Sequence, residues 1–178
     1  MKNDLKIYYY GSPILRERLP DLTELPEGFS TLVDDMFELM SQEEGIGLSA
    51  NQVGKGLRFF IANFSLYSDS MEKQVFINPE IIESEGETRD EEGCLSLPDI
   101  QVNVKRADCI KVKYKDRDFV SHVEEYSGYL SRVIQHETDH LNGTYMTDRI
   151  SPLKRKLLDN KLKQISKMAK QELSQKQE

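Results

Sequence analysis

Residues 129–142 constrain the fold more than any other part of the chain. On a helical wheel one side carries Tyr129, Leu130, Val133, Ile134, His136, Glu137, His140 and Leu141. The opposite side carries Ser131, Arg132, Gln135, Thr138, Asp139 and Asn142. Asn142-Gly143 then supplies a left-handed residue of the kind that ends helices. The pattern therefore predicts a helix that turns two histidines and a glutamate toward the protein interior.

This placement requires a partner for the three reactive groups. A buried carboxylate and two imidazoles without partners lose several kcal/mol of solvation free energy. A divalent metal bound by His136 and His140 removes that cost, because side chains four residues apart on a helix can reach one ion. Glu137 is then placed to accept a proton from water activated by the metal. The motif HExxH thus predicts a metal site, while buried histidines that lack such a pattern are usually core residues.

A catalytic site of this kind usually has three protein ligands and one open position. Downstream of His140 the chain offers acidic residues but no histidine or cysteine. Upstream, Cys94 in EGCLSLP could complete a Cys-His-His set. Cys109 and His122 lie in segments with strand patterns, and for both we favour a structural role.

The rest of the chain predicts an α+β fold. Residues 30–43 have apolar positions at helical spacing, and the glycine-punctuated loop GIGLSANQVGKG follows. Strand patterns occupy 57–63, 74–82, 100–104, 109–114 and 118–126, with a hairpin turn at KDRD and a bend or a sheet edge at Asn78-Pro79. We expect antiparallel strands packed around a central HExxH helix, with a further helix at the C-terminus.

The 178 residues predict a single domain spanning 1–178, with the basic C-terminal helix 152–178 as part of it. Beyond Pro152, eight Lys or Arg stand against three Asp or Glu, so this tail carries +5 and the remainder −12, which together give the net charge of −7. A basic tail on an acidic body predicts either contact with a polyanion or a solvated helix face. The sequence contains no membrane-spanning run and no signal peptide, so we expect a cytoplasmic protein that does not bind membranes.

Three motifs together resemble those of bacterial-type peptide deformylases. They are GIGLSANQ at 45–52, EGCLSLP at 92–98 and QHETDHL at 135–141, and the similarity extends from GSPILR to RISPLKRK. The resemblance implies hydrolytic removal of the N-formyl group from the formyl-methionine of newly made polypeptides, with release of formate. It assigns one divalent metal ion to Cys94, His136 and His140: ferrous iron as the usual physiological metal, with zinc, nickel or cobalt able to replace it.

The resemblance also assigns roles around the metal. Glu137 would be the general acid and base, while the Gln52 side-chain amide and the Leu95 backbone N–H would stabilise the oxyanion. Gly45, Ile46, Gly47 and Gly93 would lie along the peptide substrate. The methionine side chain would enter an apolar pocket that includes Ile46, Tyr129 and Val133, although core packing explains Tyr129 and Val133 nearly as well.

Four positions differ from the family pattern or are variable in it. Ser49 stands where most members have alanine, and we expect little effect from so small a side chain. Asn51 occupies a variable position, Tyr129 is larger than the usual aliphatic residue, and Arg132 is expected at the rim of the site.

Two other functions fit parts of the pattern. A zinc peptidase shares HExxH, but it needs a third ligand downstream and leaves Cys94 and Gln52 without roles. A non-catalytic, metal-stabilised module that binds ribosomes predicts a closed site with four ligands. A basic terminal helix docks some relatives on the ribosome, and charge complementarity with ribosomal RNA makes the same docking reasonable here.

Overall fold

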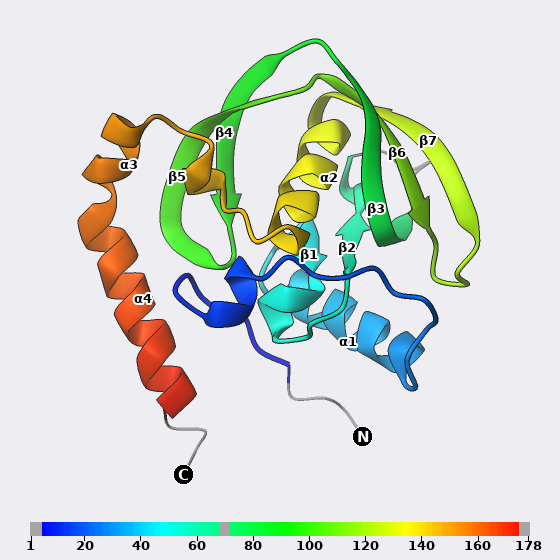
Figure 1. The fold of residues 1–178 in the computed structure, drawn as a ribbon, viewed down its shortest axis with the longest axis horizontal. Helices are drawn as coiled ribbons and strands as arrows, with labels where there is room; N and C mark the ends of the chain where they lie inside the picture. Colours follow the sequence, from blue (N-terminus) through cyan, green and yellow to red (C-terminus); the bar gives the residue numbers. More distant parts are fainter. Residues whose placement is uncertain (1–4, 68–71, 175–178) are drawn as a thin grey trace.

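The computed structural model describes residues 5–67 and 72–174 of the chain. Its helix α2 (Gly128–Leu141) runs through the centre of the molecule, between a large sheet and a separate hairpin (Figure 1). This arrangement confirms the predicted α+β fold with antiparallel strands around the HExxH helix.

The large sheet is antiparallel, with strand order β1-β2-β3-β6-β7. Its strands are β1 (Gly47–Ser49), β2 (Phe59–Asn63), β3 (Lys73–Glu85), β6 (Cys109–Lys115) and β7 (Ser121–Ser127). Strand β3 is central, and its register against β6 shifts between Ile77 and Glu80. Asn78 has a positive φ of 51° at this point, so the predicted bend at Asn78-Pro79 is a β-bulge.

Alternation along β2 divides the core between the two faces of the sheet. Phe59 and Ile61 pack with helix α1 (Phe29–Gln42), whereas Phe60 and Ala62 pack on the side of α2. Phe60 and Phe76 stack with ring centroids 4.6 Å apart beneath Ile134 and Leu141 of α2. The apolar side of α2 therefore rests on the sheet as the wheel predicted.

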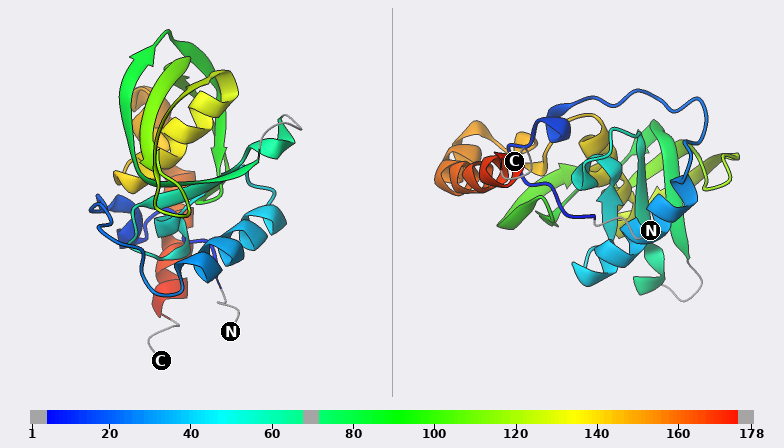
Figure 2. Two further views of the ribbon diagram at one scale, coloured as in Figure 1. Left: turned by 90° about the vertical axis from the view of Figure 1, so that its right-hand side faces the viewer. Right: turned by 90° about the horizontal axis from the view of Figure 1, so that it is seen from below.

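The second sheet is a hairpin formed by β4 (Thr88–Cys94) and β5 (Leu97–Arg106). Strand β4 was not predicted, because its sequence TRDEEGC is almost entirely polar. In Figure 2 the hairpin lies beside α2 on the side away from the large sheet. It therefore covers the side of α2 that the wheel predicted to be polar.

Short helical turns join these elements. They are the 3-10 helices η1 (Pro13–Arg16), η2 (Ala50–Val53), η3 (Phe64–Leu66) and η4 (Met146–Asp148). The glycine-rich loop expected at 45–56 is thus partly regular, because it contains β1 and η2.

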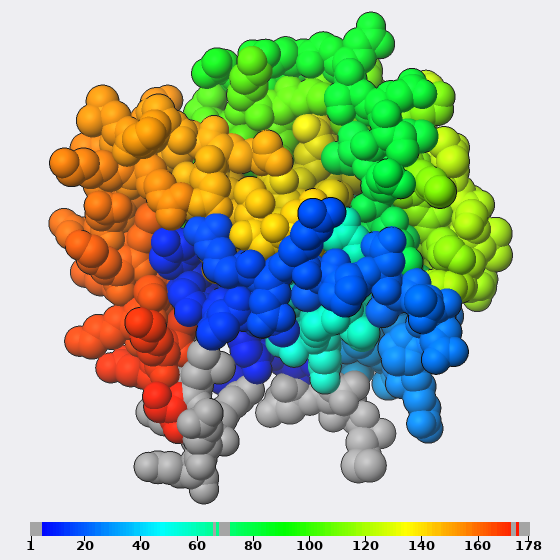
Figure 3. Space-filling view, in the orientation of Figure 1, coloured from blue at the N-terminus to red at the C-terminus, as the bar shows by residue number. Residues whose placement is uncertain are grey.

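The C-terminal region forms two helices rather than one, α3 (Pro152–Leu157) and α4 (Asp159–Ser174), and residues 175–178 lie outside the described part. Leu162, Ile165 and Ala169 of α4 are buried, the first two in a cluster with Leu97 and Tyr145. In Figure 3 both helices lie along one edge of the molecule, next to the N-terminal segment. No helix in the described ranges has the length and apolar character needed to cross a membrane.

Candidate active site

Three side chains from two separate segments converge at the centre of the molecule. Cys94 ends β4, and His136 and His140 lie one turn apart on α2; one ligand atom from each lies within 4.8 Å of the others. Cys94 Sγ and His140 Nε2 are 3.2 Å apart, as are the Nε2 atoms of the two histidines. Both imidazoles are buried and Cys94 is half-buried. The geometry thus groups the residues that the sequence offered as metal ligands.

The donor set fits a divalent transition metal. A thiolate and two imidazoles are ligands for zinc, iron, nickel or cobalt, and three protein ligands leave a position open for water or substrate. Within the described part of the chain, His140 Nδ1 is buried without a hydrogen-bond partner, while Nε2 points at the other two ligand atoms. The protein therefore directs three ligand atoms toward one point.

Glu92 contacts Nδ1 of His136, the ring nitrogen opposite the one that faces the other ligands. Its Oε2 lies 3.0 Å from His136 Nδ1, and its two carboxylate oxygens also accept bonds from Arg106, with Nε at 2.7 Å and Nη2 at 2.8 Å. Arg132 Nη1 adds a bond of 2.7 Å to Oε1. Burial alone would raise the pKa of Glu92, but the hydrogen bonds from Arg106 and His136 outweigh it and lower the pKa far below its usual range.

This arrangement corrects the prediction for one side of α2. Ser131, Arg132, Thr138 and Asp139 are all buried rather than solvated. Arg106 of β5 explains much of the change, because its Nη1 also binds Asp139 Oδ2 at 2.7 Å. Arg132 belongs to the same ion-pair network and lines the cavity from a buried position, not from an exposed rim.

Glu137 lies beside the convergent ligands with one carboxylate oxygen free. The side chain is 4% exposed, and its Oε2 has no hydrogen-bond partner within the described residues. Burial raises the pKa of Glu137 to about 7, although the nearby charges of His136 and Arg106 oppose the shift. A carboxyl group with this pKa can both accept and release a proton near neutral pH.

The two histidines differ electrostatically. For His136 burial lowers the pKa, but the hydrogen bonds to Cys94 and Glu92 outweigh burial and raise it. For His140 burial lowers the pKa, and the neighbouring charges of His136 and Arg106 lower it further. His140 is therefore the more readily neutral imidazole, which is the form that binds metals.

Gln52 approaches the ligands from η2. Its Nε2 lies 3.6 Å from Cys94 Sγ and donates to Ser96 Oγ at 3.1 Å, while Ser49 N and Oγ both donate to its Oε1. The amide nitrogen therefore faces the reactive centre. Ser49 and Ser96 were not predicted as parts of the site, since a serine in a loop carries no spacing signal by itself.

A cavity of about 690 Å³ opens onto this centre. Its lining contains every remaining residue predicted at the site: Gly45, Ile46, Gly47, Gly93, Leu95, Tyr129 and Val133. Tyr129 is 38% exposed and its ring stacks on Tyr67 at a centroid distance of 4.4 Å, so it belongs to the cavity wall and not to the core. Sequence patterns did not indicate that Leu97, Ile100, Gln101 and three carboxylates, Glu44, Glu91 and Asp99, also line the cavity.

Cys109 and His122, for which the sequence favoured structural roles, lie apart from the site. Cys109 is the first residue of β6 and is exposed, so it is a strand residue without a core position. His122 lies on β7, half-buried, with Nε2 2.7 Å from Asp116 Oδ2. Neither lies in the lining of the cavity.

Comparison with known proteins places these features in a family. The family model described as polypeptide deformylase matches residues 4–156. The chain belongs to this family. As a polypeptide deformylase it is a hydrolase that removes the formyl group from an N-terminal methionine.

The sequence and the fold of this chain are similar to those of curated and solved polypeptide deformylases over nearly its whole length. The peptide deformylase of Thermotoga maritima is 43% identical over 166 residues, which cover 93% of this chain and 98% of that protein. Crystal structures of the peptide deformylases from Legionella pneumophila and Thermus thermophilus superpose with TM-scores of 0.83 and 0.84, at 37% and 36% identity. Each comparison covers 92% of this chain, and 96% and 98% of the respective relative.

Proposed function

We propose that the chain removes the formyl group by metal-assisted hydrolysis centred on Cys94, His136 and His140. The observation that carries this proposal is the convergence of these three ligands beside a buried, half-free carboxylate and a directed amide. A divalent ion held there would acidify a water molecule and polarise the formyl carbonyl. Ferrous iron is the metal we propose for the cell, with zinc, nickel or cobalt as substitutes, since ligand preference alone does not select iron.

Glu137 moves the proton in this scheme. Its free Oε2 accepts a proton from the attacking water, whose oxygen adds to the formyl carbon. The same carboxyl group then delivers the proton to the departing nitrogen as the C–N bond breaks. The products are formate and a peptide with a free N-terminal amine.

Gln52 and Leu95 stabilise the charge that develops on the formyl oxygen. The Gln52 amide donates without adding charge or titrating, and the Leu95 backbone N–H lies in the turn between β4 and β5 next to Cys94. Loss of one such donor typically costs about 3–4 kcal/mol of transition-state stabilisation. Both donors are held before substrate arrives, because hydrogen bonds to Ser49 and Ser96 fix the Gln52 amide and Leu95 lies in the short turn between the paired strands β4 and β5.

The peptide substrate fits the edge of the large sheet. Strand β1 is an edge strand in the order β1-β2-β3-β6-β7, and Gly45, Ile46 and Gly47 line the cavity at its start. An extended peptide can pair its backbone with such an edge. The first side chain then enters the part of the cavity formed by Ile46, Tyr129 and Val133.

The zinc-peptidase alternative is less well supported by the geometry. It needs a third ligand downstream of α2, whereas among the described residues the group with both histidines contains Cys94. Downstream, Asp148 is engaged by Arg16 and Arg155. Of the alternatives considered, formamide hydrolysis alone uses both Cys94, as a metal ligand, and Gln52, as a donor to the oxyanion.

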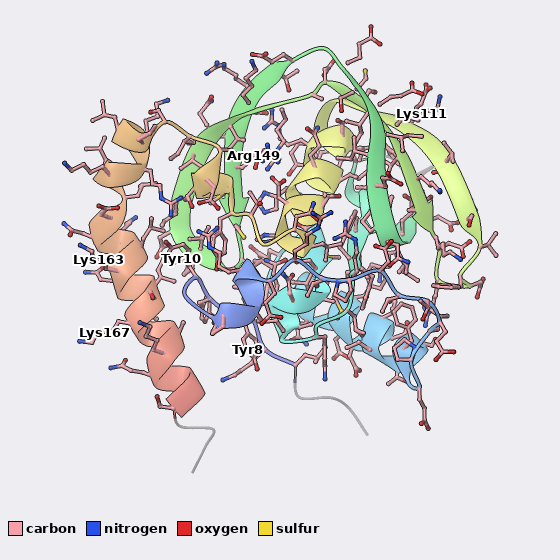
Figure 4. The ribbon with its side chains drawn as sticks, viewed as in Figure 1. Tyr8, Tyr10, Lys111, Arg149, Lys163 and Lys167 are labelled. Atoms are coloured by element: carbon pink, nitrogen blue, oxygen red, sulfur yellow. The ribbon has the colours of Figure 1, made fainter. Side chains whose placement is uncertain are left out.

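Exposed lysines on α4 form a surface that could contact the ribosome, where new polypeptides emerge. Lys163 and Lys167 project outward from α4 (Figure 4), and Lys170 is also exposed; all three line a surface pocket together with Tyr10 of the N-terminal segment. Because the apolar stripe of α4 is buried, these lysines form a fixed basic face. We infer that this face approaches ribosomal RNA close to emerging polypeptides.

The proposed function is tested by formate release from a formyl-methionyl peptide. The protein is purified without oxygen and loaded with ferrous iron, and the same peptide without its formyl group detects internal cleavage. We expect formate from the wild type and none above background from Glu137→Gln, with metal content equal in the two proteins. Loaded enzyme that releases no formate, or that cleaves the unformylated peptide, would contradict the proposal.

A further inference from the structure

Ser49 donates two hydrogen bonds to the glutamine of the site. Ser49 Oγ donates to Gln52 Oε1 at 2.8 Å, and Ser49 N donates to the same oxygen at 2.9 Å. Ser49 is 0% exposed and Gln52 is 2% exposed, so water does not compete for these bonds. The Ser49 hydroxyl is thus a second buried donor on one amide oxygen.

These bonds determine which way the amide faces. A glutamine amide has an oxygen that accepts and a nitrogen that only donates. If the group were reversed, its NH₂ would meet the Ser49 N–H, which can only donate. At the other end of the amide, Nε2 donates one hydrogen to Ser96 Oγ at 3.1 Å. Its second hydrogen points toward Cys94 Sγ, 3.6 Å away.

We propose that Ser49 is a positioning residue for deformylation, acting through Gln52. The inference rests on the proposed function, in which Gln52 Nε2 donates to the oxyanion. The hydroxyl restrains rotation of the amide, and by donating to Oε1 it polarises the amide so that Nε2–H becomes a stronger donor. Ser49 therefore contributes in the transition state, contrary to the small effect that the size of its side chain suggested.

The first test is the kinetics of Ser49→Ala. Its backbone N–H keeps one bond to Oε1, so we expect kcat to fall about five- to tenfold, or about 1–1.4 kcal/mol, with KM unchanged. An interaction made only in the transition state lowers kcat in this way, whereas lost substrate binding raises KM. A Ser49→Ala enzyme with wild-type kcat would overturn the inference.

A double-mutant cycle separates positioning from general damage. Gln52→Ala removes the donor through which Ser49 acts, so adding Ser49→Ala to it should cost no further activity. Equal losses with and without Gln52 would show that Ser49 acts by another route. Failure of the wild type to release formate would instead refute the proposed function, which keeps the two failures distinct.

A spectroscopic measurement needs no turnover. The side-chain NH₂ resonances of Gln52, assigned with Gln52→Ala, should shift in Ser49→Ala because Oε1 loses one of its two donors. Ser131→Ala is the matched control, since Ser131 is also 0% exposed and its Oγ donates to Ala107 O at 3.1 Å. We expect that control to lose a similar amount of stability while kcat and the Gln52 resonances stay unchanged; unshifted resonances in Ser49→Ala would contradict the proposal.

Discussion

At the scale of single residues, Gly47 makes room for the carboxylate of Glu137. A Cβ at position 47 would lie 2.6 Å from Glu137 Oε1 and 2.9 Å from its Cδ. Such distances are shorter than any ordinary contact, so Gly47→Ala must displace the carboxyl group of Glu137, which we propose as the general acid and base. A shift of about 1 Å can cost about 100-fold in rate. We therefore predict that Gly47→Ala lowers kcat for formate release by about 100-fold.

The control for this prediction is another glycine of the same region. Gly56 is exposed, and a Cβ there meets no atom within 4 Å. Gly56→Ala should keep wild-type kcat and a similar melting temperature. If both variants retain full activity, then Glu137 either relocates without cost or has no part in the chemistry.

At the scale of elements, Glu92 ties β4 to β5 and α2. It is paired with Arg106 and Arg132 and contacts His136, all nearly buried. Removing one partner from a buried network typically costs about 3–5 kcal/mol. We predict that Glu92→Gln destabilises the metal-free protein by about 3 kcal/mol, measured by urea unfolding. Its metal affinity, measured by chelator competition, should fall about 10- to 100-fold because His136 loses its orienting carboxylate.

A surface glutamate of the same hairpin provides the comparison. Glu87 pairs with Lys105, but both side chains are about half exposed. Exposed pairs contribute about 0–1 kcal/mol, so Glu87→Gln should change neither stability nor metal affinity by a measurable amount. Equal effects of the two substitutions would mean that the Glu92 network is no more than ordinary surface electrostatics.

Asp148 joins η1, η4 and α3 and makes their association depend on pH. Burial raises the pKa of this carboxyl group, but hydrogen bonds from Arg16, the Tyr145 N–H and Arg155 outweigh burial and lower it. A lowered folded-state pKa adds stability above the ordinary value of about 4, and this stability is lost as the pH falls through the folded-state pKa. We predict that Asp148→Asn unfolds at a lower temperature at pH 7 and that the difference is lost as the pH falls through the lowered pKa of Asp148 in the folded protein.

These elements show what local sequence patterns could and could not predict. The apolar periodicity of 30–43 and of 129–142 predicted α1 and α2 within a few residues, and HExxH with Cys94 indicated the group of three possible metal ligands. The polar side of α2 was placed wrongly in solvent, because Arg106, which binds Glu92 and Asp139, lies far from α2 in sequence. Among the described residues strand β4 pairs with β5 alone, so a polar sequence suffices and leaves no alternation to detect.

At the scale of the whole molecule, one helix serves both the core and the surface. Helix α4 closes the cluster formed with β5 and η4 through Leu162 and Ile165, and it presents Lys163, Lys167 and Lys170 to solvent. The sequence left open whether the terminal helix completes the domain or meets a polyanion. The buried residues of α4 and its exposed lysines are different positions, so packing of the helix and the proposed contact with a polyanion can be tested separately by substitution.

The exposed lysines of α4 can be replaced without altering its buried residues. Replacing Lys163, Lys167 and Lys170 by glutamine should weaken cosedimentation with ribosomes and reduce its dependence on salt, because fewer counterions are released on binding. Formate release from a free formyl-methionyl peptide should stay at the wild-type rate, since none of the three lines the active-site cavity. A matched triple substitution of Lys111, Lys113 and Lys115 on β6 removes the same charge elsewhere. If both triple variants bind ribosomes equally well, the basic face of α4 is not the docking surface, and its lysines serve only to keep a buried helix soluble on its outer side.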